Sequence, residues 1–123
     1  MIREQLVELK VPISKYEIVL GRLLNGNIVK PLLVGFAVQF EGESHYVIRL
    51  TMFPNNPYYL CKDRDSHSHY TAFAKVVRDP ESTSVRFLNP VGSGYLTPDL
   101  KSHLEIWFPL LGTSVFMNLF SKS

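Results

Sequence analysis

The sequence has a single cysteine, Cys61, among its 123 residues. One cysteine cannot form a disulfide within the chain, which excludes a small fold held together by disulfides. Residues 1–10 alternate charged and apolar side chains, so they lack the apolar segment of a signal peptide. We therefore expect a cytoplasmic protein in a reducing compartment.

Long apolar runs and charge clusters are also missing. The longest uncharged apolar stretch, residues 31–40, has about half of the roughly 20 residues that a membrane helix requires. Thirteen Lys and Arg residues and eleven Asp and Glu residues give a net charge of +2, spread along the chain without a basic or acidic tail. Proteins that neutralise many phosphates usually cluster positive charge. The sequence predicts no membrane contact, and the charge distribution weakens a nucleic-acid hypothesis without excluding it.

Aromatic residues and turn formers are plentiful instead. Eight Phe, six Tyr and one Trp, together with eight Pro and seven Gly, suit short strands and many turns better than long helices. A hydrophobic fraction of 46% is enough for one core. We expect residues 1–123 to form a single domain.

The strongest pattern is a β-hairpin over residues 32–53, where apolar residues recur at every second position. The two apolar sets are Leu32, Val34, Phe36, Val38 and Phe40 on the first strand and Tyr46, Ile48, Leu50 and Met52 on the second. Opposed residues share a face of the sheet, so aligning the sets pairs Phe40 with Tyr46 and Phe36 with Leu50. This register predicts that both sets face the core.

The N-terminal part of the chain combines a helix signal with a hairpin signal. Apolar residues at helical spacing predict a short helix over residues 2–10, which Pro12 stops. Ser14 and Glu17 have the spacing of a helix capping box, but the following apolar residues alternate up to Asn25 and Gly26. We therefore predict a strand over residues 14–24 and a hairpin turn at Asn-Gly.

The rest of the chain continues as strands. Strands are expected over residues 58–61, 70–77, 85–88, 103–108 and 115–119. Residues 89–94 predict a tight corner or a close approach to another strand, and Thr97-Pro98-Asp99 predicts one helical turn over residues 98–102. The expected fold is mostly β, α+β at most: one antiparallel sheet or a small, partly closed barrel built from consecutive hairpins.

Five potential metal ligands occur at two-residue spacing: Cys61, Asp63, Asp65, His67 and His69. In one extended strand they would project from a single face, as a set suited to zinc or another transition metal. The alternative is a solvated loop between two strands, in which alternation has no geometric meaning. A metal-assisted hydrolase built on this loop is our second alternative hypothesis.

A second candidate site combines aromatic rings with cations: Tyr58, Tyr59, Lys62 and Arg64. Rings interleaved with positive charges on a β surface bind single-stranded nucleic acid by stacking and by attraction to the backbone. Alternation along a strand, however, places about half of such rings in the core. Single-stranded nucleic-acid binding is therefore the first alternative hypothesis.

Trp107 is the third candidate, because it falls on the strand face opposite Leu104, Ile106 and Phe108. An exposed tryptophan on a sheet is a typical anchor for a protein partner. His45 and His103 fall on polar strand faces, and we expect both at the surface. The main hypothesis is a non-enzymatic binding or assembly module that contacts a protein partner or itself, with no catalytic residue and no cofactor assigned.

Overall fold

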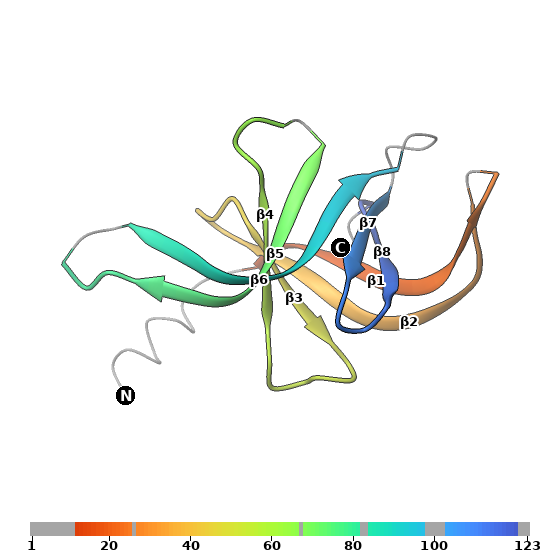
Figure 1. Cartoon of the computed structure of the whole chain (residues 1–123), viewed down its shortest axis with the longest axis horizontal. Helices are drawn as coiled ribbons and strands as arrows, with labels where there is room; N and C mark the ends of the chain where they lie inside the picture. Colours follow the sequence, from red (N-terminus) through yellow and green to blue (C-terminus); the bar gives the residue numbers. More distant parts are fainter. Residues whose placement is uncertain (1–11, 26, 67, 82–83, 98–102, 121–123) are drawn as a thin grey trace.

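The computed structural model describes residues 12–25, 27–66, 68–81, 84–97 and 103–120. This part of the chain contains β-strands and no helix. Consecutive antiparallel strands close into an irregular ring (Figure 1). The strands are β1 (Pro12–Leu24), β2 (Asn27–Phe40), β3 (Tyr46–Leu50), β4 (Tyr58–Lys62), β5 (His69–Arg78), β6 (Val85–Leu96), β7 (His103–Phe108) and β8 (Thr113–Asn118). The predicted fold class is confirmed. The helix predicted over residues 2–10 and the turn over 98–102 lie outside the described residues.

The interior of the ring is filled by side chains from alternate positions, as expected for a small closed sheet. The most completely buried large side chains are Ile18, Ile48, Leu60, Leu104, Ile106 and Met117. Inward placement of residues 104, 106 and 108 is confirmed. Among the described residues, no helix is long and apolar enough to span a membrane.

Pairing in the central hairpin is displaced by one residue from the predicted register. Gly35 lies opposite Leu50, and Ala37 lies opposite Ile48. Small residues face inward because the strands approach closely: a Cβ on Gly35 would collide with the carbonyl oxygen of Arg49. The prediction that all the large residues of this strand face the core is wrong, because Leu32 is 61% exposed and Phe36 points outward, although Val34 packs against the core.

Phe36 instead lies on the outer face, where Lys15 of β1 covers its ring. The Lys15 ammonium nitrogen is 4.2 Å from the ring centroid, within the range of a cation–π contact. Met52 is also outside the core, with 76% of its surface exposed.

Residues 14–24, which carry both a helix signal and a strand signal, lie in a strand. Residues 12–24 form β1, and Leu24 pairs with Asn27 across a turn in which Asn25 has a left-handed φ of 49°. The predicted hairpin at Asn-Gly is confirmed. β6 continues through residues 89–94, where a tight corner was one expectation and a close approach the other. The close approach is confirmed, since a Cβ on Gly92 would lie 2.7 Å from the carbonyl oxygen of Trp107.

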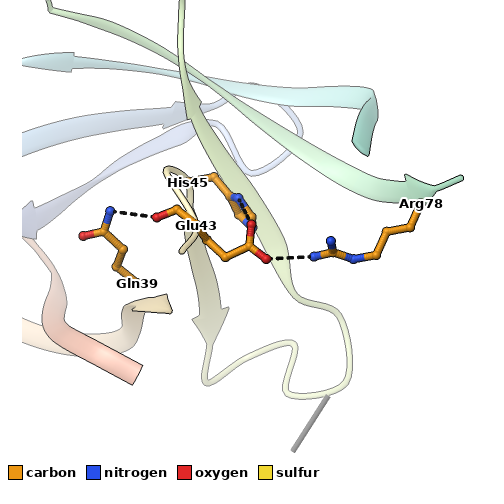
Figure 2. A network of polar contacts seen from close by, with 4 residues as sticks. All are labelled: Gln39, Glu43, His45 and Arg78. Atoms are coloured by element: carbon orange, nitrogen blue, oxygen red, sulfur yellow. Dashed lines mark hydrogen bonds and ion pairs between the residues drawn. The ribbon is translucent and has the colours of Figure 1, made fainter. Parts of the chain in front are cut away.

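Two hairpins, β1–β2 and β5–β6, extend beyond the ring as arms (Figure 1). Figure 2 shows how the β5–β6 arm is tied to the loop between β2 and β3: Arg78 Nη2 lies 3.2 Å from Glu43 Oε1. Gln39 Nε2 donates to the Glu43 carbonyl oxygen at 3.2 Å, and His45 Nδ1 lies 3.7 Å from Glu43 Oε2. These contacts fix the loop against the arm.

The prediction of a surface position for His45 is wrong, since only 7% of the residue is exposed. Its ring centroid lies 4.9 Å from that of Phe87 on the β5–β6 arm and 6.1 Å from that of Tyr59. Phe87 of the arm therefore covers His45, which lies in the loop just before β3.

Candidate interaction surfaces

The predicted metal ligands do not lie along one extended strand. β4 ends at Lys62, the chain turns, and β5 begins at His69. The turn is closed by the Asp63 amide, which donates to the His69 carbonyl oxygen at 2.9 Å. The side chains of Asp63 and His69 lie side by side, with Oδ2 and Nδ1 3.6 Å apart, while Asp65 is exposed in the turn.

Cys61 is half-buried on β4 and pairs with Thr71 of β5. Burial, and then the charge of Asp63, raise the pKa of its thiol to about 11. A thiol that stays protonated at neutral pH is a weak nucleophile and a weak metal ligand. Within the described ranges, which do not include His67, no three His, Cys, Asp or Glu side chains gather to hold a metal ion.

The structure separates Tyr58 from Tyr59, because adjacent residues of a strand point to opposite faces. The Tyr58 ring faces the interior, 5.9 Å from that of Phe108, whereas the Tyr59 ring lies outside, 6.0 Å from that of Phe87. Lys62 and Arg64 are exposed at the end of β4 and in the turn after it. One nucleic-acid surface would therefore have to use Tyr59 without Tyr58.

One end of the ring is apolar, where the loop of residues 51–57 and the turn of residues 109–112 approach β2. A cavity of about 330 Å³ opens there, lined by Leu20, Leu33, Val34, Leu50, Thr51, Met52, Phe53, Leu111, Thr113 and Val115. A smaller hollow of about 130 Å³ shares Leu50, Phe53 and Leu111 with it. We call these two hollows and their rim the apolar end.

Local backbone features of β2 and the β7–β8 turn shape the apolar end. Ile18 pairs with Gly35 and Val19 with Leu33, so Val34 is an extra residue in β2. Such a bulge bends a strand, and the Val34 carbonyl accepts a hydrogen bond of 2.8 Å from the Thr51 amide. Gly112, with a φ of 64°, closes the β7–β8 turn.

The rim of the apolar end exposes large apolar side chains to solvent. Leu110 is 90% exposed, Met52 76%, Leu33 48% and Leu111 41%. Sequence reasoning missed this surface because it assigned Met52 to the core. A usable signal was present, since residues 50–61 and 106–121 contain no charged side chain.

A second exposed surface lies on the outer side of β4–β7, where Trp107 is 41% exposed, opposite Ser93. Its placement away from the core is confirmed. Tyr95, two residues beyond Ser93, is 36% exposed, and the His69 ring stacks beside it at 6.3 Å. We call Trp107, Tyr95 and His69, with Asp63 and Glu105 beside them, the aromatic face.

Comparisons of the chain with protein-family models, with curated proteins and with solved structures found no match. The apolar end and the aromatic face are thus the two structural features on which a function can be argued.

Proposed function

We propose that this chain is a non-enzymatic binding or assembly module, and that it acts by joining a second copy of itself through the apolar end. The observation that carries the proposal is the cavity of about 330 Å³ beside the exposed Leu110. A projecting side chain and a hollow at the same end make this surface complementary to itself.

Solvation energy supports burial of this end. Covering a leucine or methionine side chain contributes about 1.5–3 kcal/mol, and monomers rarely expose contiguous apolar patches larger than a few hundred Å². Leu110 and Met52 together leave two large apolar side chains almost fully in water. Association would remove that cost.

Geometry supports a second copy as the occupant. In a two-fold dimer both protomers use the same surface. If Leu110 of one protomer enters the cavity of the other, the reverse contact follows by symmetry. The turn that carries Leu110 borders the cavity through Leu111. A cavity of about 150 Å³ holds benzene, so a hollow of about 330 Å³ accommodates a leucine side chain.

The chemistry of the lining supports binding over catalysis. Among the described residues, the only polar side chains that line the cavity are those of Thr51 and Thr113. General acid and base catalysis requires a group that exchanges a proton near neutral pH. No residue of this lining can do so.

Light scattering coupled to gel filtration tests the proposal at micromolar concentrations. We expect the wild-type chain to be a dimer and Leu110→Lys to be a monomer, because a buried ammonium group without a partner strongly disfavours the interface. Leu24→Lys is the matched control, because Leu24 is 54% exposed at the tip of the β1–β2 arm. It should remain a dimer.

A wild-type chain that stays monomeric over the whole concentration range would overturn the proposal, and so would a dimeric Leu110→Lys. A monomeric wild type would also leave the apolar end to a different protein as its occupant.

A further inference from the structure

The aromatic face is built from two rows of outward side chains that cross β4, β5, β6 and β7. One row holds Asp63, His69, Tyr95 and Glu105, and the other holds Cys61, Thr71, Ser93 and Trp107. These eight positions contain two carboxylates and no lysine or arginine. The face is therefore both aromatic and acidic.

Side-chain contacts hold the rings and the carboxylates of this face in place. Thr71 Oγ1 donates to Asp63 Oδ1 at 2.9 Å, and Asp63 Oδ2 lies 3.6 Å from His69 Nδ1. The His69 and Tyr95 rings stack at an interplanar angle of 27°. Burial, and then the Glu105 carboxylate on the neighbouring strand, raise the pKa of Tyr95. Asp63, His69 and Tyr95 therefore have less side-chain freedom to lose on binding.

Trp107 lies beside Tyr95 on this surface, on the adjacent strand β7. It pairs with Ser93, while Tyr95 pairs with Glu105, so Trp107 and Tyr95 are diagonal neighbours on adjacent strands. Diagonal neighbours on one face lie within reach of a single aromatic or long side chain. Glu105 lies two residues before Trp107 on the same face of β7, so a ligand group lying on Trp107 has the Glu105 carboxylate beside it.

An aromatic face beside carboxylates attracts cations. The π face of tryptophan attracts a cation at about 6 Å or less, and arginine both stacks on such a ring and donates two hydrogen bonds to a carboxylate. A phosphate would meet two like charges here. The charge on this face thus complements a basic peptide and opposes a nucleic-acid backbone.

We propose that the aromatic face binds an arginine-bearing segment of a protein partner, with the guanidinium group stacked on Trp107 and hydrogen-bonded to Glu105. This surface is separate from the apolar end and does not depend on the self-association proposed above. His69 and Tyr95 lie between Glu105 and Asp63 in one row, and Asp63 binds the next cationic side chain of the same extended segment.

The fluorescence of Trp107 tests the proposal directly, because it is the only tryptophan of the chain. The probe is a peptide of alternating glycine and arginine, and its counterpart alternates glycine and glutamate. We expect the arginine peptide to quench the fluorescence of Trp107 and the glutamate peptide to leave it unchanged. Glu105→Gln should weaken the affinity about fivefold or more.

Glu81→Gln is the matched control, because it removes the same charge from the exposed turn of the β5–β6 arm. It should leave the affinity unchanged. Asp63→Asn serves as an independent variant if Glu105→Gln folds poorly. The proposal is overturned if the arginine peptide does not quench Trp107, if both glutamate variants lose affinity equally, or if an oligothymidylate strand quenches Trp107 in its place.

Discussion

Glu43 and Arg78 lie 35 residues apart in sequence, yet their side chains meet at 3.2 Å. Glu43 belongs to the loop after β2, and Arg78 ends β5 on the projecting arm. Only 17% of the Glu43 side chain is exposed, against 51% for Arg78. The pair joins two parts of the ring that no strand pairing connects directly.

We expect Arg78→Ala to lower the free energy of unfolding by only about 0–1 kcal/mol, since the arginine is half in solvent. Its main effect should be local: amide hydrogens of the β5–β6 arm should exchange faster. Urea unfolding and hydrogen exchange measure the two effects. Arg86→Ala on β6 is the control, and equal acceleration of exchange in both variants would contradict this role for Arg78.

Gly35→Ala should destabilise the fold by about 1–3 kcal/mol, because the new methyl group meets backbone atoms that cannot move aside. Those atoms are the carbonyl oxygen of Arg49 and the Cα of Leu50. Gly94→Ala is the matched control, because its added Cβ would lie 3.4 Å from side-chain atoms of Leu104 and Tyr70. Similar losses in the two variants on urea unfolding would contradict the close approach at Gly35.

Cys61 should react slowly with iodoacetamide at neutral pH. Its reaction rate should rise with pH through about 11, because the folded protein keeps the thiol protonated. Unfolded in guanidinium chloride, the same cysteine should show its ordinary pKa, near 9.0. Rapid alkylation of the folded chain at pH 7 would be incompatible with a buried thiol.

The raised pKa of Cys61 also makes stability depend on alkaline pH. Its contribution is complete below pH 9.0 and is lost as the pH rises through about 11. In Cys61→Ala the melting temperature should therefore decrease less at alkaline pH than in the wild type. Part of the decrease should persist in the variant, because burial also raises the pKa of Tyr46 and Tyr70. An unchanged pH profile would count against this assignment.

Burial lowers the pKa of His103 below its ordinary value of 6.5. Because the folded state favours the neutral imidazole, stability should fall as the pH drops from 6.5 through the lowered pKa. His103→Gln should reduce this acid sensitivity, as measured by melting temperature between neutral and mildly acidic pH. An equal or greater loss in the variant would show that other groups cause it.

The strand position and inward face of β7 could be predicted from the sequence because alternation there coincides with burial. On β8 the alternating Val115 and Met117 are buried, but so is Phe116 between them. At β2 the same rule failed. Apolar periodicity marks a large residue such as Phe36 as core, but it does not record how closely two backbones approach. A side chain at Gly35 would collide with the backbone of β3, and Ala37 is fully buried on the same face.

The composition of the candidate surfaces depends on contacts between residues far apart in the sequence, which local patterns do not predict. Trp107 could be placed outside the core from its own strand, which also supplies Glu105, whereas Asp63, His69 and Tyr95 reach the same face from the turn after β4, from β5 and from β6. His45 is buried by Phe87, which is 42 positions away and was not paired with it by any local pattern. The order in which the strands pair determines both the neighbours of Trp107 and the burial of His45.

The ring closes between β1 and β8 through just two residue pairs, at Ile18 and Val19. Few backbone hydrogen bonds between the described residues resist the opening of such a short seam. Once β1 peels away, an open edge of β8 faces solvent and accepts the first strand of a neighbouring chain. We therefore expect any strand exchange between copies to start at this seam.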